Sequence, residues 1–203
     1  DDDFPLVRIT RHEDATDDGP LVMLVQGLAR GEKMDSVIRH ATELGVAAFM
    51  PLTCERSIVK LDAKKTRTRL DRWCSIAKSA AMQSGQPRIP EVLEPRSAKE
   101  AAAELAEATA VLICWEEAPQ TASLAQAIGR GLSECSCPRG DARIAVVVGP
   151  EGGLTEREVG FLRAATPRAS LVSLGSSILR TETAGVVAPA LTLYELGKLG
   201  GTR

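Results

Sequence analysis

The sequence has few histidines and too few cysteines for a disulfide scaffold, and these shortages argue against several kinds of site. Its five cysteines are an odd number, which argues against a disulfide scaffold. Cys135 and Cys137 form a lone C-x-C, and the chain has only two histidines, His12 and His40. Because a structural zinc site needs four such ligands at regular spacings, we expect two reduced loop cysteines and no metal.

Long apolar runs are also missing. The run IAVVV at 144–148 is far shorter than the roughly 20 residues that a membrane-spanning helix needs. The first residues, DDDFPLVRIT, lack the basic and apolar regions of a signal peptide. We therefore expect a cytoplasmic protein that does not enter the membrane.

The common nucleotide and hydrolase motifs do not occur either. The glycine cluster GPEGG at 149–153 matches neither G-x-G-x-x-G nor the P-loop pattern, and no P-loop lysine follows it. No G-x-S-x-G occurs, and neither histidine lies near the polar segments described below. These absences argue against a dinucleotide site, a nucleoside triphosphate site and a serine hydrolase.

Basic residues, in contrast, are concentrated in one part of a chain whose net charge is only -2. Eight basic residues and two acids lie between Arg56 and Lys78, a charge density that suits a phosphate backbone. A solvated helix face is the alternative explanation. The candidate RNA-binding residues are Arg56, Lys60, Lys64, Lys65, Arg67, Arg69, Arg72 and Arg88.

Apolar periodicity predicts strands alternating with helices. Strands are expected at 21–28, 46–53, 109–115, 144–148 and 170–175, with a short extended piece at 88–95. Helices are expected at 32–44, 64–84, 97–108, 121–132, from 155 onward, and at 183–198. This order predicts an α/β fold whose mostly parallel sheet has helices on both faces.

Local signals mark several helix ends. Ser97 with Glu100 and Thr155 with Glu158 have the spacing of capping boxes, and Gly45 ends the first helix. Pro189 lies inside the last predicted helix, where its ring would clash with the carbonyl four residues earlier. We therefore predict a kink or a break in that helix after residue 185.

Three polar segments follow predicted strands: WEEAP at 115–119, GPEGG at 149–153 and LGSSILRTET at 174–183. In parallel sheets, ligands bind beyond the carboxyl ends of the strands, so all three segments face the predicted binding edge. The glycines of GPEGG allow a close backbone approach, and the helix start after them offers N–H groups to a carboxylate, a phosphate or an adenine edge. A plain tight turn is the alternative.

Two of these segments together carry a resemblance. VVVGPEGGLTEREV followed by LGSSILRTETAG resembles the bacterial 16S ribosomal RNA uridine-N3 methyltransferases, the RsmE family of the SPOUT class. The segments ATELGV, PLTCERSIVK, RWCSIAKSAAMQSGQPRIPEV and LICWEEA are similar to those of the same family, in the same order. The resemblance covers nearly the whole chain from Leu21 onward.

The resemblance implies a C-terminal deep trefoil knot, S-adenosylmethionine bound between three loops, and a homodimer that acts on 16S ribosomal RNA or the small ribosomal subunit. It also implies that 21–203 is the methyltransferase domain. Family members begin with a small PUA-like RNA-binding domain, and 1–20 is too short for it. We expect 1–20 to be its remnant or a linker.

Site residues follow from the same resemblance. The implied cofactor-binding residues are Trp115, Glu116, Gly149, Pro150, Glu151, Gly152, Gly153, Leu174, Gly175, Ile178, Leu179, Arg180 and Thr183. Methylating N3 of uracil requires loss of a weakly acidic proton, so Glu182 or Glu151 is the candidate base. Arg180 is the candidate cation for the developing anion. Helix capping by Thr181, Glu182 and Thr183 is the alternative role.

Two other functions stay open. One is a SPOUT enzyme for another RNA position, such as a ribose 2′-hydroxyl, although the segment ILRTETA disfavours it. The other is a noncatalytic RNA-binding module that has kept the fold. Glycines at 149 and 153, together with Arg180 and Glu182, favour an active cofactor site.

Overall fold

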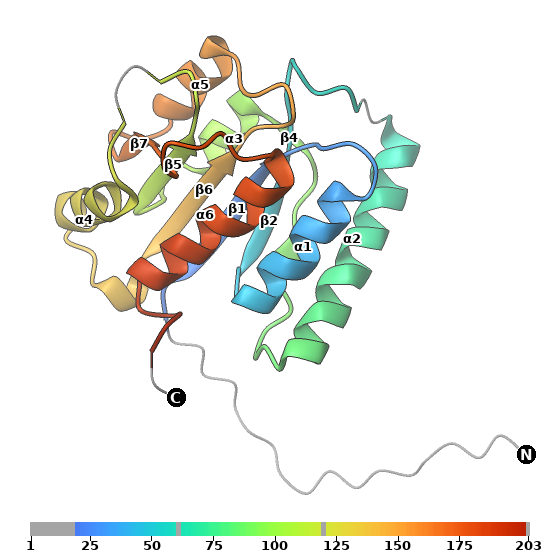
Figure 1. Ribbon diagram of the computed structural model, residues 1–203, viewed down its shortest axis with the longest axis horizontal. Coiled ribbons are helices and arrows are strands. Elements are labelled where there is room, and N and C mark those ends of the chain that lie inside the picture. Colours follow the sequence, from blue (N-terminus) through green and yellow to red (C-terminus); the bar gives the residue numbers. More distant parts are fainter. Residues whose placement is uncertain (1–18, 60–61, 119–120, 202–203) are drawn as a thin grey trace, which may run out of the picture.

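Parallel strands form the centre of the molecule, and helices cover both faces of the sheet (Figure 1). The computed structural model describes residues 19–59, 62–118 and 121–201. The strands are β1 (Leu21–Gly27), β2 (Ala48–Thr53), β3 (Glu91–Val92), β4 (Arg96–Ser97), β5 (Ala110–Cys114), β6 (Arg143–Val148) and β7 (Ala169–Val172). Their order across the sheet is β3-β2-β1-β6-β5-β7, with β4 also paired to β2. All pairings between the described strands are parallel, as predicted.

The helices are α1 (Lys33–Leu44), α2 (Ala63–Ser84), α3 (Ala98–Glu104), α4 (Leu124–Glu134), α5 (Glu156–Arg163) and α6 (Thr181–Glu195), with a 3-10 turn at Arg139–Asp141. Side chains of β1 alternate between the two faces of the sheet. Leu24 packs with α1, α2, α4 and α6, whereas Val25 packs with α3 and α5. Figure 1 shows α1, α2 and α6 side by side over one face.

The local helix signals are confirmed. Both predicted capping boxes are present, at Ser97 and at Thr155. Gly45 closes α1 with a φ of 98° and Gly85 closes α2 with a φ of 68°, both left-handed. The predicted end of α3 near Ala108 is wrong, because the helix stops at Glu104. Leu105 is buried, and the Ala108 N–H turns back to its carbonyl at 3.0 Å to enter β5.

Of the kink or break predicted in the last helix, the break is wrong. Helix α6 runs without interruption through Pro189 from Thr181 to Glu195, and it ends before the predicted Lys198. Proline removes the N–H that would bond the Gly185 carbonyl, but tertiary packing holds the helix in place. Gly185 lies directly on β1 and α1, where a Cβ would fall 2.4 Å from Gln26 Oε1. The close fit on the sheet offsets the lost hydrogen bond.

All five cysteines are free thiols. Among the helices of the described residues, none has the length and apolar character to cross a membrane.

Candidate functional site

A cavity of about 580 Å³ opens at the carboxyl ends of β5, β6 and β7, the edge where the sequence predicts a site. Each of the three predicted segments contributes. Trp115 and Glu116 line it after β5, and Gly149, Pro150, Glu151 and Gly153 line it after β6. After β7 the lining residues include Leu174, Gly175, Ile178, Leu179 and Arg180, followed by Glu182 from the first turn of α6. The structure thus brings together all but two of the cofactor candidates.

Gly152 and Thr183 are the two candidates that do not line the cavity. A Cβ on Gly152 would point toward the segment after β2 and would lie 2.9 Å from Arg56 Cβ. Thr183 is exposed in the first turn of α6. Neither residue therefore contacts the cavity directly.

The glycines of GPEGG are required by close packing. Gly153 has a φ of 70°, and a Cβ there would lie 2.6 Å from Glu116 Oε1. A Cβ on Gly149 would lie 3.1 Å from Leu154 N. Gly27, at the end of the neighbouring strand β1, also lies against this loop, because a Cβ there would lie 2.3 Å from Pro150 N. The segment is packed from three sides, which a plain tight turn would not need.

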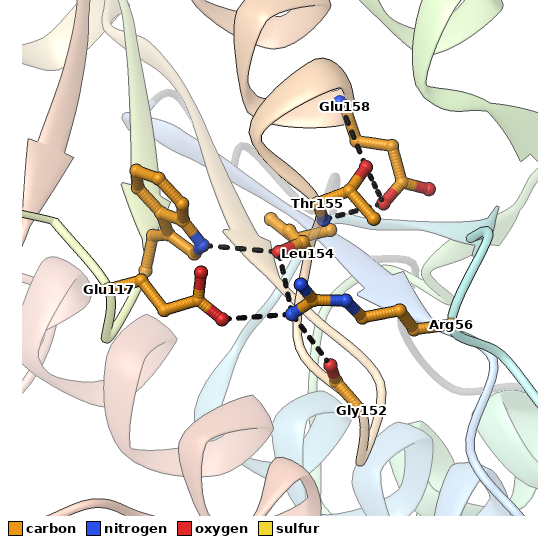
Figure 2. A network of polar contacts seen from close by, with 7 residues as sticks. Arg56, Glu117, Gly152, Leu154, Thr155 and Glu158 are labelled. Atoms are coloured by element: carbon orange, nitrogen blue, oxygen red, sulfur yellow. Dashed lines mark hydrogen bonds and ion pairs between the residues drawn. The ribbon is translucent and has the colours of Figure 1, made fainter.

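Polar contacts from distant segments hold this loop (Figure 2). Arg56, which follows β2, places its Nη1 2.9 Å from Glu117 Oε1 and 3.3 Å from the Gly152 carbonyl. The same nitrogen lies 3.5 Å from the Leu154 carbonyl, which also accepts a bond from Trp115 Nε1 at 3.2 Å. Segments after β2, β5 and β6 therefore meet at one guanidinium.

Glu158 adds a second connection behind the loop. Its side chain is almost fully buried. One carboxylate oxygen accepts from the Thr155 N–H and hydroxyl at 2.8 and 2.9 Å, which is the capping box of α5. The other oxygen accepts from the Glu55 N–H at 2.8 Å. The start of α5 is thereby tied to the residue next to Arg56.

Lys33, in the first turn of α1, lines the cavity and was missed by the sequence analysis. Its Nζ lies 3.0 Å from Glu151 Oε1 and 3.2 Å from Glu182 Oε2. Glu182 Oε2 is closed off from solvent, and its contact with Lys33 is an ion pair without hydrogen-bond alignment. Glu151 Oε1 also accepts from the Arg30 N–H at 3.1 Å. The two candidate bases therefore share one ammonium.

These contacts keep all three groups charged. Partial burial raises the pKa of Glu151, but hydrogen bonds from the Arg30 N–H and Lys33 outweigh it, and the net pKa is lowered. A backbone hydrogen bond at the start of α6 and the charge of Lys33 lower the pKa of Glu182. Close contact with Glu151 and then with Glu182 raises the pKa of Lys33. A general base works best with a pKa near the operating pH, so each glutamate, as paired here, is a weak one.

A buried chain of hydrogen bonds lies below the cavity floor. Gln26, fully buried at the end of β1, donates from Nε2 to Thr181 Oγ1 at 2.9 Å. The Thr181 hydroxyl donates in turn to the Gly149 carbonyl at 2.6 Å. The chain links β1, the first residue of α6 and the glycine loop. Sequence analysis missed Gln26, because a single polar residue in an apolar strand does not show what it faces.

Arg180 is the N-cap residue of α6 and is exposed at the rim of the cavity. Its position beside Glu182 contributes to the lowered pKa of that carboxyl. The rim therefore carries one cation on α6 and a second, Lys33, on α1.

The basic residues separate into three groups. Lys64, Lys65 and Arg67 are exposed on the first turns of α2, Arg69 is half-buried there, and Arg88 is exposed before β3. Arg72 pairs with the buried Asp35 at 2.6 Å, and Arg56 lies against the cavity loops. Lys60 lies outside the described residues.

The fold and the cavity define a class of protein. Residues 18–193 match a family model described as an RNA methyltransferase domain. The Ribosomal RNA small subunit methyltransferase E of Bacillus subtilis is 36% identical over 180 residues, 89% of this chain and 68% of that protein. The enzyme of the same name from Mycobacterium bovis is 34% identical over 173 residues, 83% of this chain and 61% of that protein. This chain belongs to the family of these small-subunit RNA methyltransferases.

A solved structure supports the same assignment. The Ribosomal RNA small subunit methyltransferase E of Neisseria gonorrhoeae, bound to S-adenosyl methionine, has a TM-score of 0.70 and 32% identity to this chain. The match covers 86% of this chain and 66% of that one. The chain thus spans about two thirds of the length of these relatives.

Proposed function

We propose that this chain is the methyltransferase domain, at 21–203, of an enzyme that transfers a methyl group from S-adenosylmethionine to N3 of a uridine in 16S ribosomal RNA, in the cytoplasm. The cavity at the ends of β5, β6 and β7 carries the proposal, because it lies in a chain of this family and three separate segments build it. The relative from Neisseria gonorrhoeae was solved with that cofactor bound.

The residues around the cavity fit such a cofactor. Gly149 and Gly153 leave room where side chains would fill the wall, so backbone groups are open to a flat adenine edge. Glu116, Glu151 and Glu182 give the lining an acidic character that suits a sulfonium. We propose that the candidates after β5, β6 and β7 hold it, and that 174–183 threads through a trefoil knot. When bound, S-adenosylmethionine supplies an activated methyl group.

The chain's own residues would manage the charge on the uracil ring. Loss of the N3 proton places negative charge on the two ring oxygens, and a fixed cation stabilises it. Arg180 at the rim, with Lys33 opposite on α1, suits that role. Glu151 or Glu182 is the proposed base, and either one gains basicity when Lys33 shifts toward the other.

We propose that RNA lies over the first turns of α2. Lys64, Lys65 and Arg67 are exposed there, and Arg69 is half-buried beside them; Arg88, which follows the far end of α2, is proposed as a separate RNA contact. Arg56 and Arg72 are left out of this surface, because their guanidinium groups already contact other parts of the protein. Neutralising Lys64, Lys65 and Arg67 together should weaken RNA binding and flatten its salt dependence, while cofactor affinity stays unchanged.

Homodimerisation belongs to the same proposal. Helix α6 carries two large apolar side chains at its outer surface, Leu191 and Tyr194, which are 39% and 61% exposed. They lie in the last turns of the helix whose first turn lines the cavity, so a partner molecule packed against them would contact that same helix.

Transfer of labelled methyl groups from S-adenosylmethionine to unmethylated small ribosomal subunits tests the proposal, followed by analysis of the nucleosides. The expected product is 3-methyluridine. A 2′-O-methylated nucleoside would point instead to a relative that acts on ribose. RNA binding without cofactor binding would point to a noncatalytic module.

A further inference from the structure

Arg56 belongs to the basic segment at 56–78, but its guanidinium contacts the loops that form the cofactor cavity. Its Nη1 contacts Glu117 after β5 and the Gly152 and Leu154 carbonyls after β6 (Figure 2). Arg56 itself does not line the cavity, whereas residues on both sides of its contacts, Glu116 and Gly153, do.

The glycine loop is shaped around this arginine. A Cβ on Gly152 would lie 2.9 Å from Arg56 Cβ and 3.0 Å from the Arg56 carbonyl. A Cβ on Gly153 would lie 3.7 Å from Arg56 Nη1. Backbone and side chain of Arg56 thus occupy the outer side of the loop, opposite the cavity. Without the guanidinium, the bond from Trp115 Nε1 to the Leu154 carbonyl would be left as the side-chain hydrogen bond between the two loops.

The contact is poorly suited to a stabilising role. The side chains of Arg56 and Glu117 are 43% and 47% exposed, and ion pairs that face water this much contribute little to the free energy of folding. The contact is notable for its geometry and not for the energy that it contributes. One donor group joins two loops that are separated along the chain and that form adjacent walls of the same cavity.

We infer that Arg56 is a positioning residue for the cofactor site: it fixes the loop after β6 against the loop after β5, so that the walls of the cavity keep their spacing. This inference rests on the proposed function. It separates Arg56 from Lys64, Lys65 and Arg67, which have the same charge but lie on the exposed surface of α2. The basic segment therefore contains two functions, cofactor-site geometry at its start and RNA contact farther on.

Three variants of the full chain distinguish these functions: Arg56→Ala, Arg56→Lys and the control Arg67→Ala. Calorimetry measures the dissociation constant for S-adenosylmethionine, and a filter assay measures that for small-subunit RNA. Arg56→Ala should raise the cofactor constant about tenfold or more, since small displacements of site groups are costly. Its melting temperature should change little. Arg67→Ala should weaken RNA binding and leave the cofactor constant within about twofold.

Arg56→Lys separates charge from geometry. It keeps the positive charge that an RNA contact would use, but a single ammonium cannot copy the planar fork of arginine. Loss of cofactor affinity in Arg56→Lys with RNA affinity retained supports the inference. Retained cofactor affinity in Arg56→Ala, together with a loss of RNA affinity like that of Arg67→Ala, overturns it.

Amide hydrogen exchange in the cofactor-free chain gives an independent measurement. The Gly153 N–H bonds the Pro150 carbonyl at 2.9 Å and the Ala118 N–H lies 3.4 Å from the Trp115 carbonyl, so each amide reports on one loop. Both should exchange faster in Arg56→Ala, and unchanged exchange contradicts the inference. If the unmodified chain binds no S-adenosylmethionine, the proposed function fails and the inference with it. Equal binding by the unmodified chain and Arg56→Ala overturns the inference alone.

Discussion

Two loops that form facing parts of the cavity are held in different ways. The loop after β6, at 149–155, is contacted by side chains from the segments after β2 and β5 and from α1 and α6. In the loop after β7, at 173–180, the described side-chain hydrogen bonds stay within the loop, between Ser173 and Gly175. Leu174 and Leu179 pack on the core, whereas Ile178 is 85% exposed.

The loop after β6 therefore forms a wall of the cavity that keeps its shape before a ligand binds. The loop after β7 forms a wall that can still change shape around a ligand. Backbone groups held by several partners keep their positions before binding, which lowers the entropy cost of association. A loop with two apolar anchors and exposed polar groups between them can still adapt. We expect the β6 loop to set where a cofactor lies and the β7 loop to close around it.

The largest expected effect comes from a substitution that crowds the loop after β6. In Gly27→Val the new side chain meets Pro150 N at 2.3 Å and Pro150 Cδ at 2.6 Å, and backbone cannot move aside cheaply. Unfolding in urea should show a loss of about 3 kcal/mol. Gly160→Ala is the control, because nothing lies within 4 Å of its Cβ and the residue is exposed in α5. It should be neutral or stabilising. Equal losses in both variants would contradict the packing argument.

A smaller loss is expected from Thr181→Val. The substitution removes the hydroxyl that donates to the Gly149 carbonyl and accepts from Gln26 Nε2. The Gly149 carbonyl loses this donor, and Gln26 Nε2 keeps only its bond to the Gly27 carbonyl at 3.3 Å. The free energy of unfolding should fall by about 1 to 2 kcal/mol. Thr181→Ser keeps the hydroxyl and should recover most of it. If serine loses as much as valine, the methyl group, which serine lacks and valine keeps, contributes as much as the hydroxyl, which contradicts a dominant role for the hydrogen bonds.

Lys33→Met should mainly change the pH dependence. The lowered pKa values of Glu151 and Glu182 mean that their ionised forms stabilise the fold above the ordinary glutamate value of 4.5. That contribution is lost as the pH falls through the lowered values. Without Lys33 both pKa values should rise toward the ordinary value, so this contribution becomes smaller and its loss is complete at a higher pH. Carbon NMR titration of the two carboxyl groups measures this.

Two controls accompany that titration. Lys33→Arg keeps the positive charge and should keep both pKa values low. Lys99→Met removes an exposed lysine on α3 and should leave them unchanged. Unaltered pKa values in Lys33→Met would show that the backbone N–H groups alone hold the two carboxylates.

The smallest effect on stability is expected from Ile178→Ser in the adaptable loop. Its side chain is exposed, so the free energy of unfolding should change by less than about 0.5 kcal/mol. We expect a weaker affinity for S-adenosylmethionine nonetheless, because Ile178 lines the cavity. Urea unfolding and calorimetry on the same preparation test both statements. A large loss of stability would show that this loop is as firmly built as the other.

The sequence predicted the features that depend on residues close together along the chain. Capping boxes and glycine caps need only residues three or four positions apart, and alternation of strands and helices indicates a parallel sheet. The three polar segments were located because each directly follows an apolar strand. Their meeting in one cavity follows from the rule for parallel sheets.

The missed features depend on which strands become neighbours. Lys33, Gln26 and Gly27 act on the β6 loop because β1 pairs with β6, and no local pattern reports that pairing. Arg56 was grouped with RNA contacts because charge density does not show which way a side chain points. Pro189 stays helical because Gly185 fits closely on β1, which propensity alone does not include.

The pairing of β1 with β6 has a consequence for how the protein is made. Leu21 pairs with Arg143, so one edge of β1 has no partner until most of the chain has left the ribosome. The other edge can pair early, since β2 and its two helices follow soon after in synthesis. Until β6 arrives, the apolar strand LVMLV exposes an open edge, which is a surface prone to aggregation. Parallel strands so distant in sequence fold slowly, and we expect the cofactor site to be the last part of the molecule to form.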